Sequence, residues 1–123
     1  MTTPPDPRSI ESVNIALLRK IVERHQVWGR MAANYGVDNP VPPWKSSLDG
    51  MCDALDQSTC GASFLASTRR RSEEDQLAAT VYADLPYPEN QLVSLAHSLV
   101  VGGVIDEKEL QERIAGVRAR LEA

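Results

Sequence analysis

Three consecutive arginines, Arg69, Arg70 and Arg71, form the most concentrated positive charge in a chain whose formal net charge is −4. A guanidinium group presents a planar fork of N–H donors that binds oxyanions in a bidentate manner, so the run is a candidate anion-binding element. The acidic stretch 72–75 follows at once, and the alternative is a solvated helix face with local ion pairs. A charge-assisted hydrogen bond contributes roughly 1.5–3 kcal/mol and an exposed ion pair roughly 0–1 kcal/mol. The sequence leaves both interpretations open.

Other reactive residue types form no catalytic or metal-binding pattern. His25 and His97 lie far apart in the sequence with no acid–base partner at useful spacing, and His97 flanks an apolar helix face, which favours a packing role. The spacing of Cys52 and Cys60 matches no common zinc pattern, and we expect two free thiols. Nucleophile-elbow, P-loop and dinucleotide-binding motifs are absent from the sequence. We therefore expect no metal site and no complete active site in this chain.

Composition predicts one folded domain with a thin core. The chain has 123 residues, 42% of them hydrophobic and 24% charged, but only one Phe, three Tyr and two Trp. A core built from Leu, Val, Ile and Ala raises the expectation that a partner completes some apolar face. The acidic charge argues against nucleic acid as the main partner. With no long apolar run and no secretory signal pattern at the N-terminus, we expect a cytoplasmic protein and no membrane association.

The first part of the chain is predicted to be an arm, a helix and a connector. Three prolines in residues 1–8 favour a flexible arm, and residues 9–123 are expected to form the domain. A single long helix is predicted over residues 9–34, beginning at Ser9. Residues 35–45 contain one glycine and three prolines, which predicts an extended connector that delivers Trp44 to the next element. The residues expected on the buried stripe of the long helix are Ile10, Val13, Leu17, Ile21, Arg24 and Trp28.

Residues 46–123 are expected to be helical as well. A helix is predicted over 46–56, another from about residue 64 into the arginines, where Ser72 is a weak cap for a further turn, and a third over 89–101 that ends at Gly102-Gly103. Asp106 is the expected N-cap of a final helix. The inward residues of the first of these helices are expected to be Leu48, Met51, Cys52 and Leu55, and those of the third are Leu92, Leu95, Ala96, Leu99 and Val100. An apolar seam, Leu110, Ile114, Val117 and Leu121, predicts that the last two helices pack as an antiparallel pair. The predicted fold class is all-α, a small irregular helical domain.

The segment from Thr80 to Ala123 resembles the helical domain of non-metal (beta-type) subunits in the nitrile hydratase family. That family includes thiocyanate hydrolase and the toyocamycin nitrile hydratase type. The matching features are "LPYP" at 85–88, a helix, "GVID" at 103–106 and a capped final helix. "PVPPW" at 40–44 is similar to the family's proline-then-Trp approach, and an arginine cluster precedes the Tyr82 region in both. The resemblance covers roughly residues 40–123.

This resemblance implies a subunit of a hetero-oligomer that hydrates a C≡N group. In such enzymes cobalt(III) or iron(III) is bound by a Cys-x-x-Cys-Ser-Cys loop of the metal-carrying alpha-type subunit, with two of the cysteines oxidised, and a further small SH3-like barrel subunit is expected. Arg70 and Arg71 are then expected to hydrogen-bond the oxidised cysteines, with Arg69 the less favoured candidate. The wall of the substrate pocket is expected to include Trp44, Tyr82 and Tyr87.

Two other functions stay open. Activators (metallochaperones) of nitrile hydratases have a similar helical domain and bind the metal-carrying subunit only transiently. A helical adaptor outside any enzyme would instead use the arginines to dock phosphates or acidic peptides.

Overall fold

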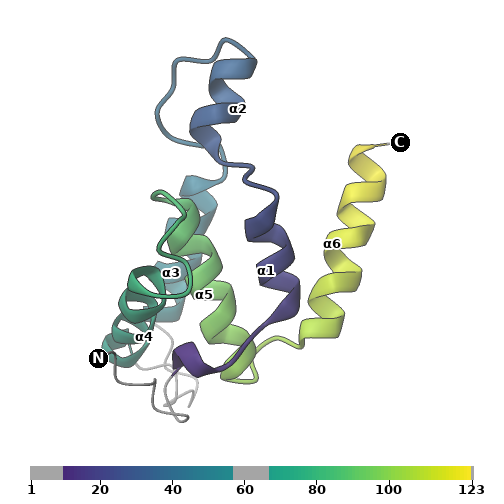
Figure 1. Ribbon diagram of the computed structural model, residues 1–123. Helices are drawn as coiled ribbons and strands as arrows, with labels where there is room; N and C mark the ends of the chain where they lie inside the picture. Colours follow the sequence, from purple (N-terminus) through teal and green to yellow (C-terminus); the bar gives the residue numbers. More distant parts are fainter. Residues whose placement is uncertain (1–9, 57–66, 123) are drawn as a thin grey trace, which may run out of the picture.

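A computed structural model describes residues 10–56 and 67–122, and within these ranges every regular element is a helix (Figure 1). The all-α fold class is confirmed. The expected arm at 1–8 and Cys60 lie outside the described residues. The elements are η1 (Ile10–Ser12), α1 (Ala16–Glu23), α2 (Trp28–Asn34), α3 (Lys45–Asp56), α4 (Ser67–Ala79), α5 (Glu89–Val101) and α6 (Glu107–Leu121). None of these helices has the length and apolar content needed to cross a bilayer.

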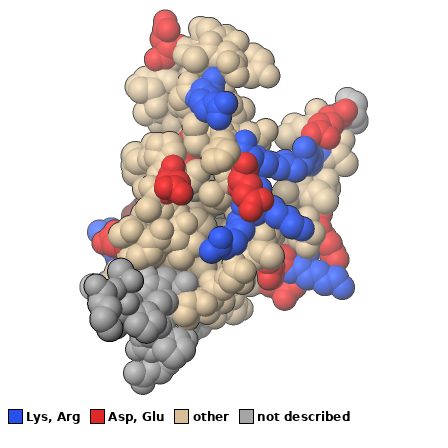
Figure 2. Space-filling model, viewed as in Figure 1, with Lys and Arg blue, Asp and Glu red and all other residues tan. Residues whose placement is uncertain are grey.

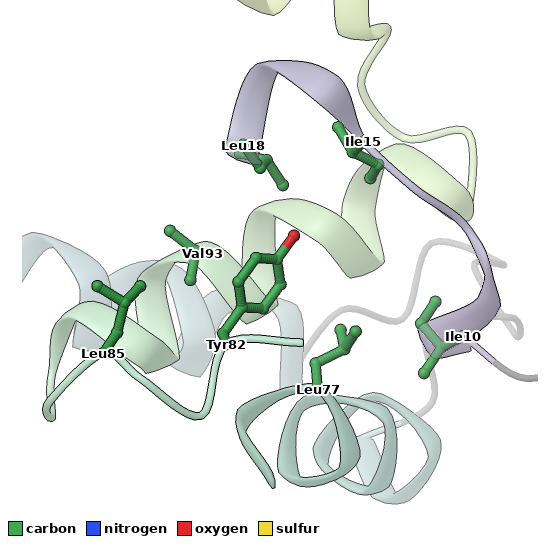
Figure 3. Close-up of a cluster of buried hydrophobic side chains, with 7 residues drawn as sticks. All are labelled: Ile10, Ile15, Leu18, Leu77, Tyr82, Leu85 and Val93. Carbon is green, nitrogen blue, oxygen red and sulfur yellow. The ribbon is translucent and has the colours of Figure 1, made fainter. Parts of the chain in front are cut away.

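Helix α5 is the central element, with apolar clusters on two of its sides. Val93 belongs to a cluster that η1, α1, α4 and the loop after α4 complete (Figure 3). Leu95 and Leu99 belong to a second cluster with Leu48 of α3. The bounds of α5 match the prediction. Its buried residues extend well beyond one stripe of the helix, and Leu92, which was predicted to point inward, is 39% exposed. The buried residues of α5 are Glu89, Val93, Ser94, Leu95, His97, Ser98 and Leu99.

The single long helix predicted over 9–34 is wrong, because the chain breaks it twice. The first break lets Ile10 and Ile15 enter the same cluster, where they are 7% and 2% exposed. In a continuous helix, residues five apart point about 140° away from each other, so both could not reach one core. Ile15 is instead extended, with φ −108° and ψ 101°. The predicted buried stripe is confirmed at Ile10 and wrong at Val13 and Ile21, which are 41% and 37% exposed.

The second break separates α1 from α2, and carboxylates from distant helices cap both starts. His25 has a φ of 52°, and the N-cap residues Ile15 and Val27 make no side-chain cap hydrogen bond. The backbone N–H of Trp28 donates to Glu89 Oε1 at 2.7 Å, and that of Leu17 donates to Glu107 Oε1 at 3.2 Å. A carboxylate at a helix start satisfies an otherwise unpaired N–H and interacts favourably with the helix dipole.

Helices α3 and α4 form the other walls around α5. Helix α3 lies where a helix was predicted, although Met51 is 48% exposed rather than inward. Residues 35–44 before it contain no helix or strand, and Trp44 packs against the Leu48 cluster. Helix α4 continues through Ser72, so that residue does not begin a new turn. The expected start of this helix near residue 64 lies outside the described residues.

Helix α6 starts as predicted but packs differently. Asp106 Oδ2 accepts a hydrogen bond from the Glu109 N–H at 3.0 Å, and Gly103 takes the left-handed conformation with φ 76°. No residue of α6 is buried, so the predicted packing of its seam against α5 is wrong. Helix α5 is already covered by the two clusters, and Glu107 holds the start of α6 at α1 instead. Figure 1 shows α6 standing beside α1 at the edge of the molecule.

Candidate functional site

A polar cavity of about 530 Å³ lies between α3, α4 and the start of α5. It brings together two of the predicted site residues, Arg71 and Tyr87. Its lining also contains a thiol, two carboxylates and two amides. The lining residues are Cys52 of α3, Arg71, Glu74, Asp75 and Ala78 of α4, Tyr87 of the loop before α5, and Asn90 and Gln91 of α5.

One face of α4 supplies the charged wall of this cavity. Arg71, Glu74, Asp75 and Ala78 have the i, i+3, i+4, i+7 spacing that places residues on the same side of a helix. Arg71 is exposed, whereas Glu74 is only 8% exposed. The backbone of Arg69 and Arg70 belongs to α4, but their side chains lie outside the described part of the chain. Of the three arginines, Arg71 is therefore the one that can be assigned to the cavity.

The opposite wall is held by contacts between helices and a cation over an aromatic ring. Gln91 Nε2 donates to Cys52 Sγ at 3.8 Å, which links α5 to α3. Tyr87 is 66% exposed, and Lys45 Nζ lies 5.4 Å from the centre of its ring, a cation–π distance. Lys45 also pairs with Asp49, and this hydrogen bond, followed by one to Tyr87, raises the pKa of Lys45. Lys45 therefore lies against the Tyr87 ring beside the cavity.

The cavity has mixed charge, which limits the ligands that suit it. The Arg71 guanidinium shares its helix face with the carboxylates of Glu74 and Asp75. A small free anion gains little at such a wall, because repulsion by two carboxylates opposes attraction by one guanidinium. One exposed arginine beside two acidic residues is therefore a weak site for a small free anion.

Tyr82 lies in the core, so its predicted place in a substrate pocket is wrong. It is 1% exposed, and its hydroxyl donates to Nδ1 of His97 at 2.7 Å (Figure 3 shows its ring among apolar side chains). His97 Nε2 lies 3.1 Å from the carbonyl oxygen of Ile10. A carbonyl only accepts, so Nε2 carries a proton, and because burial disfavours the imidazolium, Nδ1 is the unprotonated acceptor of the Tyr82 hydroxyl.

Burial has opposite effects on the pKa values of the two buried groups, because it disfavours the charged form of each. It raises the pKa of Tyr82 to about 12. It lowers the pKa of His97 below its ordinary value. Both groups are therefore neutral at physiological pH, and the packing role predicted for His97 is confirmed. Trp44, the third residue expected in a pocket wall, packs on the Leu48 cluster and does not line the cavity.

Residues 10–56 and 67–122 contain no group of three or more side chains placed to hold a metal ion. Comparison of the chain with protein-family models, with curated proteins and with solved structures gave no match. Sequence reasoning did not select Glu74, Asp75, Asn90 or Gln91 as site residues. The spacing of the first two from Arg71 was the available signal.

Proposed function

We propose that this chain is the non-metal, beta-type subunit of a nitrile hydratase-like or thiocyanate hydrolase-like hetero-oligomer, a lyase-type complex that hydrates a C≡N group. The observation that carries the proposal is that Arg71, an exposed residue of α4, lines a polar cavity together with Tyr87. The sequence resemblance over residues 40–123 supports the same assignment. The order of α3, α4, α5, a glycine turn and a capped α6 also fits it.

In this proposal the chain completes a site on another polypeptide. Arg71 donates a fork of N–H groups to the oxidised cysteines of the metal-carrying alpha-type subunit, and Arg70 is the second candidate for this role. Oxidised thiolates are anionic and need oriented donors, which a planar guanidinium provides better than an ammonium group does. Tyr87 contributes to the wall that shields the reacting group from water. The cobalt(III) or iron(III) ion of the partner supplies Lewis-acid activation.

The test is activity of the complex assembled with a Cys-x-x-Cys-Ser-Cys subunit. Arg71→Lys keeps the charge but loses the fork, so we expect activity to fall roughly ten- to hundredfold, as loss of a charge-assisted hydrogen bond implies. Arg30→Lys is the matched control, because Arg30 is exposed on α2, away from the cavity lining. Full activity of Arg71→Lys in an intact complex would refute the role of this residue.

Size-exclusion chromatography of the co-expressed proteins distinguishes the alternatives. A subunit stays in the complex in a fixed ratio, whereas an activator is lost after the metal centre has matured. An adaptor outside any enzyme would recover no metal-bearing partner at all.

A further inference from the structure

The apolar stripe of α6 is uncovered along the described chain. Ile114, Val117 and Leu121 are 37%, 44% and 81% exposed, and Leu110 is partly buried. Their spacing of four, three and four residues is the a/d pattern of helices that pack along a seam. From Leu110 to Leu121 the stripe is about 16 Å long, or three turns. A stripe of this kind on a helix normally faces another helix, and no helix of the described chain covers it.

A groove of about 840 Å³ runs between this stripe and the region where α1 ends and α2 follows. Its second wall includes Met31 and Tyr35, which are 41% and 80% exposed. The groove therefore has apolar side chains on both walls and is open to solvent between them. The described residues that line the groove are Arg24, Gln26, Met31, Tyr35, Arg113, Ile114, Val117, Arg118, Leu121 and Glu122.

Positive charge borders the stripe on both sides. On the helix, Arg113 and Arg120 flank one side of the stripe and Arg118 flanks the other, while Arg24 lines the facing wall. Arg113 and Arg118 pair with Glu109 and Glu122 one turn away, but both pairs are exposed and such pairs contribute only about 0.3–0.5 kcal/mol each. Figure 2 shows Lys and Arg side chains gathered where α1 and α6 lie, with Asp and Glu side chains among and beside them.

These charges disfavour a second copy of α6 as the occupant. If two α6 stripes packed together, the flanking positions would face each other. In the antiparallel arrangement Arg113 and Arg120 would face the same residues of the other copy, and in the parallel arrangement Arg113 would face Arg118. Like charges in these positions destabilise helix pairs and determine partner choice. The same flanks attract a helix whose own flanking positions carry Glu or Asp.

We propose that this groove binds an amphipathic helix of another protein, about three turns long, with apolar residues on one face and acidic residues on both flanks. The apolar face packs between the α6 stripe and the Tyr35 wall, and the acidic flanks face Arg113, Arg118 and Arg120. This mode is the docking of a helix into a groove. The inference rests on the groove alone and does not depend on the function proposed above.

The test uses two fluorescein-labelled synthetic helical peptides of about 14 residues and the full chain. Both peptides have the same Leu and Ile residues at the apolar a and d positions of the heptad. They differ only at the flanking e and g positions, which carry Glu in one peptide and Lys in the other. In fluorescence anisotropy titrations we expect the Glu peptide to bind at least tenfold more tightly than the Lys peptide and to lose affinity as salt is raised. The double variant Arg113→Glu/Arg120→Glu should reverse this preference.

Val117→Asp should abolish binding of the Glu peptide without unfolding the chain, because Val117 is exposed. Val41→Asp is the matched control, since Val41 is 48% exposed and lies outside the groove. Circular dichroism and the midpoint of thermal unfolding verify that each variant is folded. Equal binding of both peptides, or no binding of either, would overturn the proposal. A concentration-dependent dimer in sedimentation that Val117→Asp dissociates would overturn it as well, because the occupant would then be a second copy.

Discussion

Replacing Tyr82 by Phe removes one oxygen atom from the core and nothing else. In the wild-type protein that hydroxyl donates to His97 Nδ1 at 2.7 Å, and His97 in turn donates to the Ile10 carbonyl at 3.1 Å. His97 is 0% exposed, so after the substitution water cannot replace the lost donor and Nδ1 becomes a buried acceptor without a partner. Leaving such a group unsatisfied costs roughly 1–3 kcal/mol. We expect the free energy of unfolding at pH 7 to fall by about that amount.

The pH dependence gives this prediction a signature that a simple packing defect lacks. The pKa of Tyr82 is about 12 in the folded protein and 10.0 as its ordinary value, so between these values the unfolded chain loses the proton first. The folded state then binds more protons, and stability falls as pH rises through this range by roughly 2–3 kcal/mol in all. Phe has no proton to lose. The Tyr82→Phe variant should therefore lack this alkaline loss.

The acid side should behave differently because it depends on His97. Burial lowers the pKa of His97 in the folded protein, so below about pH 6.5, its ordinary pKa, the unfolded chain binds the proton first. Stability should fall as pH falls from there in the wild type, and less steeply in Tyr82→Phe, because Nδ1 no longer accepts the hydrogen bond that favours the neutral imidazole.

Urea unfolding followed by circular dichroism from pH 5 to pH 12 measures both limbs. Tyr35→Phe is the control, since Tyr35 is 80% exposed, and it should stay within about 0.5 kcal/mol of the wild type and keep the alkaline loss. An unchanged free energy of unfolding for Tyr82→Phe at pH 7, together with a retained alkaline loss, would refute the reasoning.

Three further substitutions test contacts at helix ends and in the core by the same urea assay. Glu89→Ala removes the carboxylate that accepts from the Trp28 N–H and should lower the free energy of unfolding by about 1–2 kcal/mol. Glu23→Ala is the control, because Glu23 is exposed, and it should cost less than about 0.5 kcal/mol. Equal effects of the two substitutions would show that Glu89 does not cap α2. Asp106→Ala should cost about 1 kcal/mol and Asp106→Asn much less, since Asn also caps helices, and a reversed order would contradict the hydrogen bond to Glu109. Ser94→Ala should be neutral or stabilising by up to about 1 kcal/mol, because the buried Ser94 hydroxyl has no hydrogen-bond partner among the described residues; a clear loss would show that it has one.

Features determined by neighbouring residues could be predicted from the sequence. Asp106 reaches an N–H only three residues away, and the left-handed turn at Gly103 needs only a residue without a side chain. The bounds of α3 and α5 follow in the same way from local apolar spacing and flanking residues. In each case the atoms that decide the structure lie within one or two helical turns.

Features determined by distant residues could not be predicted in this way. The breaks before α1 and α2 depend on carboxylates 90 and 61 residues further along the chain. The spacing of apolar residues alone therefore predicted one continuous helix over residues 9–34, across both breaks. The seam of α6 was assigned to α5 because periodicity shows that a stripe exists but not which surface covers it.

The candidate site was predicted in part for the same reason. Arg71 and Tyr87 were selected from residue type and from the resemblance, and they do line one cavity. The contact between Gln91 and Cys52 joins two helices and has no local signal. The prediction that Tyr82 lines the pocket was wrong because the burial of Tyr82 depends on the packing of η1, α1 and α4 around it. The sequence does not show this packing.

We propose above that this chain completes a metal site carried by another polypeptide. The most direct test of this proposal is native mass spectrometry of the tagged chain purified from the cells that naturally produce it. We expect a hetero-oligomer of fixed ratio that contains cobalt or iron and a Cys-x-x-Cys-Ser-Cys subunit with oxidised cysteines. Recovery of the chain alone, or only with partners that have neither the metal nor the oxidised cysteines, would contradict it.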